Sequence, residues 1–393
     1  MRYDFDRHIE RRGTCSVKWS DEIMRQMNGR TGLTPLWVAD MDFACPQPVI
    51  DAVIEEARRG IYGYSHRTEG YFESFIDWNK SRHGWKVEKD WLIYSAGVVM
   101  ALNAIIQELT EEGDKVIIQP PVYHPFFYSV RNNGRQVLEN NLMELPGCDY
   151  AMDFEGLQKM ASDPGAKLAI LCSPHNPVGR VWREDELRRF GEICLANGVL
   201  VVADEIHSDL IFKGHKHIPF ATLSEDFARC SITCTAPSKT FNIAGLQVSN
   251  LIVPDEGIRA ALSERMEANG IEEPNIFGVV AAEAAYRHGE EWLAQVLDYL
   301  EANADLIGDF VREMMPGVGY RKPEGTHLAW LDFRRMGMDE GGLKMLVVDK
   351  AGLALNLGAM FGSSGSGFAR LNFGCPKALL GDCLSRLCSA YRA

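Results

Sequence analysis

Short, continuously apolar runs recur between residues 91 and 254. They are "WLIYSAG" (Trp91–Gly97), "KVIIQ" (Lys115–Gln119), "KLAILCS" (Lys167–Ser173), "GVLVVADE" (Gly198–Glu205), "CSITCTA" (Cys230–Ala236) and "SNLIVP" (Ser249–Pro254). Runs rich in Val, Ile and Leu without polar alternation are typical of strands covered on both faces. Helical patterns separate several of them, such as "VVMALNAIIQEL" and a polar segment around 184–197. The pattern predicts an α/β fold with a mostly parallel sheet flanked by helices.

The pattern changes after Pro274. Helical periodicity extends from about 275 to 315, with a break near Gly289. Short apolar runs then alternate with helical segments again, as "THLAWLDF", a helix around 342–351, "LALNL", "FARLNFG" and a terminal helix. This alternation predicts a second, smaller α/β domain that the long helix joins to the first.

The length of the chain also favours two domains. At 393 residues it exceeds what one ordinary hydrophobic core spans. We expect a large domain over 46–285 and a small domain made of 1–45 together with 286–393. With 46% apolar and 24% charged residues, the composition is that of a soluble globular protein.

The charge and the N-terminus narrow the class of protein further. A net charge of −13 argues against nucleic acid and against anionic membranes as partners. The first residues, "MRYDFDRHIERR", lack the apolar segment of a secretory signal. No apolar run approaches the roughly 18 residues that a membrane helix needs. We therefore expect a cytoplasmic protein.

Ten cysteines are present, but their spacing does not indicate a metal site. No CxxC pair occurs, and Cys230 and Cys234 have no second ligand pair at a spacing typical of zinc sites. Buried free thiols are the favoured interpretation, and no metal is expected.

One lysine follows a predicted strand in an unusual setting. In "TAPSKTFNIAGL" (Thr235–Leu246), Lys239 stands between two hydroxyl residues with apolar residues close behind. A lysine whose ammonium is shielded from solvent has a lowered pKa and becomes a nucleophilic amine, as Schiff-base chemistry requires. A lone lysine is more often a solvated loop residue. The rest of the chain must decide between these alternatives.

Polar residues also follow other strands of the predicted sheet. Asn176 follows "LAILCSPH", Asp204 ends "GVLVVA", and these two and Lys239 are separated by about 28 and 35 residues, close to one βα unit. Ligands of open α/β sheets bind beyond the carboxyl ends of the strands, so the three side chains can converge. Gly97, at the head of a predicted helix with Val98 and Val99, offers free backbone N–H groups to a phosphate.

Each of these residues has an ordinary structural alternative. Asp204 either caps a following helix or keeps a heterocyclic nitrogen protonated, and a lysine Schiff base with such an aspartate is the signature of pyridoxal phosphate. Asn176 is either a turn residue or a hydrogen-bond partner of the cofactor's phenolic oxygen. Tyr123 either packs in the core or stacks on the cofactor ring. Arg370, in "FARLNFG", either faces solvent or binds a substrate carboxylate with its two-pronged guanidinium.

Taken together, the sequence resembles the fold-type I pyridoxal-phosphate enzymes, the aspartate-aminotransferase-like superfamily. Within it, the chain resembles the cystathionine β-lyase or cysteine–sulfur lyase branch. The resemblance is carried, in order, by "PLWVADMDF", "GIYGYS", "PPVYHPF", "SPHNPVGRVW", "ADEIHSDL", "APSKTFNIAGL" and "FGSSGSGFARLNFGCP", which span about 35–376. The combination is far more specific than any one motif.

The resemblance implies a role for each matching position. Lys239 carries the cofactor as a Schiff base, and Asp204 pairs with its pyridine nitrogen. The cofactor site is completed by Asn176 and His207 near the phenolic oxygen, Tyr123 on the ring, and Gly97, Val98, Val99 and Ser238 at the phosphate. Arg370 binds the substrate α-carboxylate, with Ala39 and Asn176 beside it. Tyr64 reaches the phosphate of a neighbouring subunit, so a homodimer with shared active sites is expected.

Two departures from the wider superfamily favour the lyase branch. His207 stands where aminotransferases usually carry Tyr, and Gln247 stands where they usually carry a phosphate-binding Arg. We expect α,β-elimination of cystathionine or a related cysteine S-conjugate, giving pyruvate, ammonia and a thiol. A class I/II aminotransferase is the main alternative. A cofactor-binding regulator that acts through a protein partner is a third.

Overall fold

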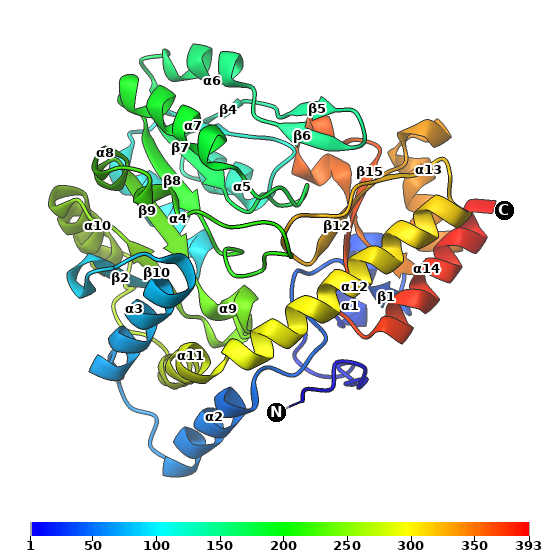
Figure 1. Cartoon of the computed structure of the whole chain (residues 1–393), viewed down its shortest axis with the longest axis horizontal. Coiled ribbons are helices and arrows are strands. Elements are labelled where there is room, and N and C mark those ends of the chain that lie inside the picture. Colours follow the sequence, from blue (N-terminus) through cyan, green and yellow to red (C-terminus); the bar gives the residue numbers. More distant parts are fainter. Residues whose placement is uncertain (1, 393) are drawn as a thin grey trace.

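The structure is a computed structural model that describes residues 2–392. Its largest sheet has seven strands in the order β2-β10-β9-β8-β7-β3-β4 (Figure 1). The strands are β2 (Leu92–Ser95), β3 (Lys115–Ile118), β4 (Gln136–Glu139), β7 (Ala166–Cys172), β8 (Leu200–Asp204), β9 (Ser231–Thr235) and β10 (Ser249–Ile252). Neighbours from β9 to β4 run parallel, whereas β10 is antiparallel to both β9 and β2. The predicted α/β fold with a mostly parallel sheet is confirmed.

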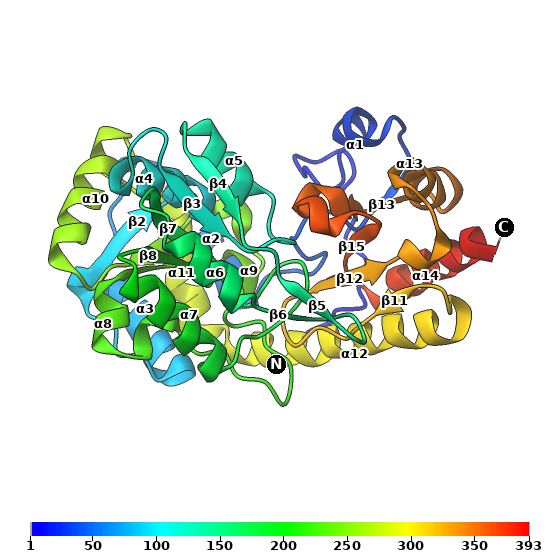
Figure 2. The ribbon, with the colours of Figure 1, turned by 90° about the horizontal axis from the view of Figure 1, so that it is seen from above.

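Helices cover both faces of this sheet, as the unbroken apolar strands predict (Figure 2). In β3, Val116 and Ile118 pack toward α4 (Val98–Leu109), α5 (Pro125–Asn132) and α10 (Glu256–Ala268). Ile117 points to the opposite face, toward α6 (Phe154–Ala161), α7 (Glu184–Ala196) and α8 (Glu225–Arg229). Successive strand residues point to opposite faces, so both must be apolar.

A second sheet of four antiparallel strands lies at the other end of the molecule. Its order is β11 (Gly319–Tyr320), β12 (Leu328–Asp332), β15 (Phe368–Asn372) and β14 (Asn356–Leu357). The expected strand "LALNL" is divided, because β13 (Leu353–Ala354) pairs instead with β1 (Thr34–Pro35). The segment changes partners within a few residues and so joins the N-terminal part of the chain to the second sheet.

A long helix connects the two sheets. The helical segment predicted over 275–315 is α11 (Ile276–His288) followed by α12 (Glu290–Met314), with the break at Gly289. A Cβ atom on Gly289 would lie 2.3 Å from the ring of Phe241, so only glycine allows this close approach. The helix α12 runs from the large sheet along the second one (Figure 1). The domain boundaries at 45/46 and 285/286 stay a prediction.

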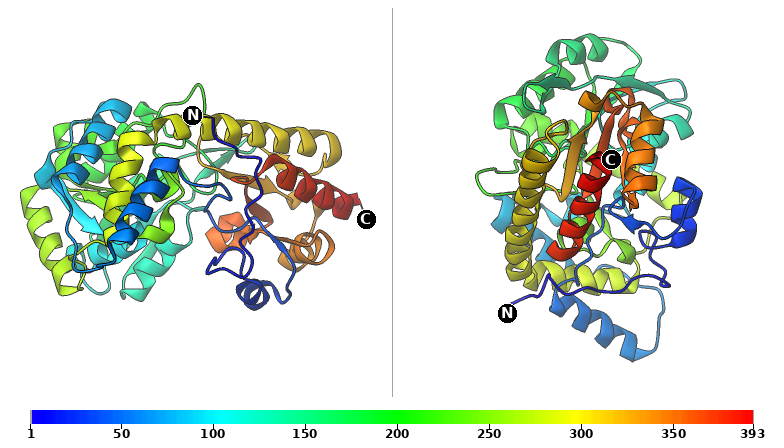
Figure 3. Two further views of the ribbon diagram at one scale, coloured as in Figure 1. Left: turned by 90° about the horizontal axis from the view of Figure 1, so that it is seen from below. Right: turned by 90° about the vertical axis from the view of Figure 1, so that its right-hand side faces the viewer.

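The remaining elements frame these two parts. Helices α2 (Gln47–Arg59) and α3 (Glu69–His83) pack on α11, and α13 (Glu340–Lys344) and α14 (Lys377–Arg392) flank the second sheet. The N-terminal segment passes beside α12 on its way to α1 (Asp21–Asn28) (Figure 3). Within residues 2–392, no helix is long and apolar enough to span a membrane.

Candidate active site

A cavity of about 260 Å³ opens at the carboxyl ends of the central parallel strands. It gathers ten of the twelve predicted site residues: Ala39, Gly97, Val98, Val99, Tyr123, Asn176, Asp204, His207, Ser238 and Lys239. A larger cleft of about 1000 Å³ between the β5–β6 hairpin (143–151) and α12 contains none of them. The smaller cavity is therefore the candidate active site, because the predicted chemistry converges there.

Lys239 lies just beyond β9, in the short helix α9 (Pro237–Thr240). Its Nζ atom donates a hydrogen bond of 2.7 Å to the backbone oxygen of Ala39. Burial lowers the pKa of Lys239 to about 8, against an opposing influence from the Asp40 carboxylate. A larger share of this amine is neutral at pH 7 than in a solvated lysine, which favours a nucleophile and base over a loop lysine.

Asp204 is the last residue of β8 and is buried. Burial raises the pKa of its carboxyl group to about 7, although the N–H of Ile206 donates to it across 3.2 Å. A turn, not a helix, follows β8, so the alternative of a helix cap is wrong. Among residues 2–392 no basic side chain forms an ion pair with Asp204. A buried carboxyl group of this kind suits a cationic partner such as a protonated ring nitrogen.

Arg370 reaches the edge of this site from the second sheet. It lies in the middle of β15 and is buried, so the alternative of a solvent-facing arginine is wrong. Its guanidinium donates to Asn176 Oδ1 (3.0 Å), Trp37 O (2.8 Å) and Asn356 Oδ1 (2.7 Å). The same group lies 4.9 Å from the ring centroid of Phe361. Burial lowers the pKa of Arg370 to about 10, but the group stays cationic at neutral pH.

The opposite end of the cavity is formed by a helix N-terminus. Gly97 precedes α4, and the first hydrogen bond inside this helix runs from the Ala101 N–H to the Gly97 carbonyl. The N–H groups of Val98 and Val99 therefore have no partner within the helix. Ser238, from α9, lines the same cavity. Unpaired N–H groups at the positive end of a helix are suited to a phosphate.

His207 and Tyr123 line the cavity between these two ends. His207 is buried, its Nδ1 atom has no hydrogen-bond partner, and burial, reinforced by Lys239, lowers its pKa to about 3. The imidazole is therefore neutral and offers one free nitrogen. Tyr123 packs edge-on against Phe126 and presents an aromatic side chain to the cavity. The cavity thus combines an amine, a buried carboxyl group, an aromatic ring and an anion site, and this set fits pyridoxal phosphate.

Tyr64 does not reach the cavity of its own chain. It lies in the loop between α2 and α3 and is fully exposed, with Ile61 79% and Tyr62 60% exposed beside it. Three large exposed side chains in one short loop are unusual for a surface that stays in water.

Several residues that support the site were not singled out from the sequence. His327 is buried with neither ring nitrogen bonded, and its ring centroid lies 5.8 Å from that of His207. Asn242 and Asn372 bind the backbone of the segment that contains Ala39. Asn372 follows Arg370 by two residues on β15, and this same-face spacing was a usable signal. Nothing in the sequence around Asn356 or His327 indicated that these residues lie beside Arg370 and His207, respectively.

Comparisons with known proteins agree with this geometry. The family model for aminotransferase class I and II matches residues 32–387. The chain is 46% identical to cystathionine beta-lyase PatB of Bacillus subtilis, over 98% of this chain and 99% of that protein. Cystalysin from Treponema denticola, which contains pyridoxal 5'-phosphate, superposes with a TM-score of 0.96 at 37% identity, covering 100% of this chain and 99% of that one.

A pyridoxal-phosphate-bound C–S lyase from Staphylococcus hominis superposes with a TM-score of 0.93 at 32% identity, covering 100% of this chain and 99% of that one. The cofactor of this fold is pyridoxal phosphate, which the cavity fits. The chain belongs to the aminotransferase class I and II family, among its pyridoxal-phosphate-dependent members.

Proposed function

We propose that the protein is a pyridoxal-phosphate-dependent carbon–sulfur β-lyase. Its substrates are cystathionine or a related cysteine S-conjugate. The observation that carries the proposal is the convergence of Lys239, Asp204 and the Arg370–Asn176 pair on one cavity. Full-length similarity to a cystathionine beta-lyase supports elimination over the other reactions of this family.

We assign the cofactor contacts from the cavity geometry. Lys239 holds the aldehyde carbon through its amine, and Asp204 holds the ring nitrogen as a protonated group. The other contacts are Asn176 and His207 at the phenolic oxygen, Tyr123 on the ring face, and Gly97, Val98, Val99 and Ser238 at the phosphate. Apart from the covalent link at Lys239 and the ring contact of Tyr123, each assignment pairs a donor with an acceptor or a cation with an anion.

Arg370 and Ala39 orient the substrate. The guanidinium already donates to three oxygens, and its Nε atom has no partner, so a carboxylate can bind it as a fork with modest rearrangement. Burial of Arg370 strengthens this contact, because the charge lies in a region of low dielectric constant.

Pyridoxal phosphate supplies an aldehyde that condenses with amines and a ring that accepts the electron pair released at Cα. With the cofactor bound, Lys239 Nζ would be the base that takes the Cα proton of the substrate. Such a positioned base contributes typically 10²–10⁴-fold in rate. The net reaction would release a thiolate from Cβ with the electron pair of the carbon–sulfur bond, and addition of water would give pyruvate and ammonia. Asp204 keeps the ring electron-poor throughout.

A class I/II aminotransferase is the second candidate, because the family whose model matches the chain takes its name from such enzymes. One observation weighs against it. Gln247, which stands where aminotransferases usually carry a phosphate-binding arginine, does not line the cavity, and its backbone oxygen accepts from the Tyr94 hydroxyl across 3.0 Å. A regulator that acts through a protein partner is a third candidate, and turnover by the isolated protein would argue against it.

We also propose that the active protein is a homodimer whose sites are shared. The exposed loop around Tyr64 and the exposed side chains of Val99 and Met100, at the phosphate end of the cavity, are two apolar patches on one chain. A two-fold pairing lets each loop cover the partner's cavity. The Tyr64 hydroxyl then donates a hydrogen bond to the phosphate held by the other chain.

The experiment that tests the function is an assay of purified protein with several cysteine S-conjugates. Thiol and pyruvate should appear in equal amounts from cystathionine. A protein that releases neither from any thioether is not a β-lyase.

A further inference from the structure

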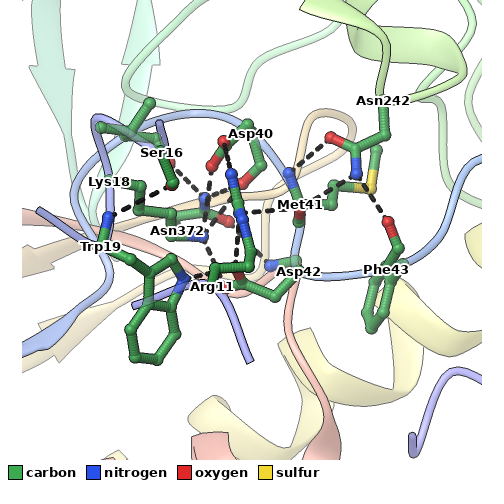
Figure 4. Close-up of polar contacts among 12 residues, drawn as sticks. Arg11, Ser16, Lys18, Trp19, Asp40, Met41, Asp42, Phe43, Asn242 and Asn372 are labelled. Carbon is green, nitrogen blue, oxygen red and sulfur yellow. Dashed lines mark hydrogen bonds and ion pairs between the residues drawn. The ribbon is translucent and has the colours of Figure 1, made fainter. Parts of the chain in front are cut away.

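A cluster of buried and half-buried charges lies behind the active site and has no part in the mechanism above. Lys18 is fully buried, and its Nζ atom donates to Asp42 Oδ2 (2.7 Å) and to the backbone oxygen of Asp40 (3.1 Å). Arg11 forms ion pairs with Asp40 (2.6 Å) and Asp42 (2.7 Å), and the indole N–H of Trp19 also donates to Asp42 (2.8 Å) (Figure 4). Buried ion pairs add little net stability, so their presence calls for another reason.

The cluster holds a segment that we call the bridging loop, residues 37–43. Two asparagines anchor this loop to segments that carry the active site: Asn372 at the end of β15, and Asn242 in the turn after α9. Asn372, two residues after Arg370, donates to Val38 O (2.5 Å) and Asp40 O (2.6 Å). Asn242, three residues after Lys239, donates to Met41 O and Phe43 O and accepts from the Met41 N–H (Figure 4).

The bridging loop also contacts the two active-site cations directly. Arg370 donates to the backbone oxygen of Trp37, and Lys239 donates to that of Ala39. Lys18 donates to the carbonyl of Asp40, and Lys239 donates to the carbonyl of Ala39, the residue before it. A shift of the Asp40 Cα atom moves the Ala39 carbonyl with it, because both belong to one planar peptide unit.

We propose that Lys18 and Asp40 are positioning residues for the reaction, which hold the bridging loop so that the Ala39 carbonyl faces the amine of Lys239. The proposal rests on the proposed role of Lys239 as the group that carries the cofactor. It does not depend on which reaction the cofactor then supports.

The charges around Lys239 predict the direction in which each substitution changes the pKa of its amine. From the bridging loop and the N-terminal segment, Asp40 raises the pKa of Lys239 and Lys18 lowers it. From the two sheets, Asp204 raises it and Arg370 lowers it. His207 and His327 also face the amine, but both are neutral because burial lowers their pKa values. Removing the charge of Asp40 must therefore lower the pKa of the Lys239 amine, and removing the charge of Lys18 must raise it.

The test uses the cofactor-loaded protein and three substitutions, Asp40→Asn, Lys18→Met and Lys18→Arg. The readout is the pH at which the absorbance of the bound cofactor changes, together with the pH profile of kcat/KM. Arg30→Gln is the matched control, because Arg30 lies on the same N-terminal segment and forms an ion pair with Asp349 (3.8 Å), away from the cluster.

We expect the midpoint pH of the absorbance change to fall in Asp40→Asn and to rise in Lys18→Met, each by roughly half a pH unit or more. The midpoint of Lys18→Arg should lie closer to that of the wild type. Arg30→Gln should leave the midpoint unchanged. If Asp40→Asn and Lys18→Met lower thermal stability while the midpoint stays within the error of the control, the cluster only stabilises the fold and the proposal is overturned. If Lys18→Met does not fold, Asp40→Asn alone decides by the same criterion. The absorbance of the bound cofactor can be measured even if the protein cleaves no thioether. The positioning role and the β-lyase function can therefore be rejected independently.

Discussion

The guanidinium of Arg370 donates a hydrogen bond to the side-chain oxygen of Asn176 across 3.0 Å. This contact joins β15 of the second sheet to the loop that follows β7 of the large sheet. One partner is assigned to the substrate carboxylate and the other to the cofactor. Under the proposed function, this contact sets where the substrate lies relative to the cofactor ring.

Replacing Arg370 by Lys should impair substrate capture more than cofactor binding. A lysine supplies one point charge, whereas the arginine offers a planar fork that three acceptors hold in place. We expect kcat/KM to fall on the order of 10²-fold, mainly through KM, as for the loss of a charge-assisted contact. Steady-state kinetics measure this, and the cofactor absorbance of the variant serves as its control. An unchanged kcat/KM would remove Arg370 from the site.

Lys239 should be the residue that carries the cofactor. Its amine is the only lysine amine that lines the described cavity. Borohydride reduction of the loaded protein, followed by peptide mapping, should place the cofactor on the peptide containing Lys239. In Lys239→Ala, reduction should leave no covalent cofactor, whereas Lys213→Ala, a change at an exposed lysine, should label as the wild type does. Label on another lysine would contradict the assignment.

Asp204→Asn should stabilise the cofactor-free protein at alkaline pH. The pKa of Asp204 is raised by burial to about 7, from an ordinary value of 3.8, so folding favours the protonated form. Between these two pH values the folded chain binds more protons than the unfolded chain, and stability is lost as the pH rises through the window. The asparagine variant lacks this loss. Its advantage in free energy of unfolding should be greatest near pH 8 and small near pH 4.

Denaturant unfolding of both proteins, freed of cofactor, measures the difference. The same variant should lose most of its activity once loaded, because an amide cannot keep the ring nitrogen protonated. A variant that is less stable at pH 8 and retains kcat within twofold would show that Asp204 has neither role.

Tyr64 offers a test of the shared sites. Tyr64→Phe removes one hydroxyl from a fully exposed side chain, so it should weaken cofactor retention and leave the fold intact. Mixing Tyr64→Phe chains with Lys239→Ala chains should create heterodimers in which one site carries both lesions and the other carries none. Cofactor retention and activity should then reappear at the intact site.

If each site belonged to one chain, mixing would restore nothing. A protein that sediments as a monomer at micromolar concentration would also reject the shared site.

The sheet and the central site residues follow from local sequence signals. Unbroken apolar runs predicted β7, β8 and β9, because strands covered on both faces need apolar side chains at every position. Asp204 and Lys239 were predicted since both stand at the end of such a strand, where parallel sheets bind ligands.

The supports of the site could not be predicted in the same way. Asn242 and Met41 are 201 residues apart, and no periodic pattern predicts a contact at such a separation. Lys18 gave no signal, because a lysine among polar residues normally lies in water. Only the folded chain places its ammonium beside Asp42.

The balance between elimination and amino-group transfer tests the central claim most directly. The purified, cofactor-loaded protein is incubated with cystathionine and an excess of a keto acid other than pyruvate. Thiol, pyruvate and the amino acid formed from the added keto acid are measured in the same sample. We predict thiol and pyruvate in equal amounts over many turnovers, with the amino acid from the keto acid a minor product. Amino acid formed in step with loss of the keto acid, without thiol, would contradict the lyase and establish an aminotransferase.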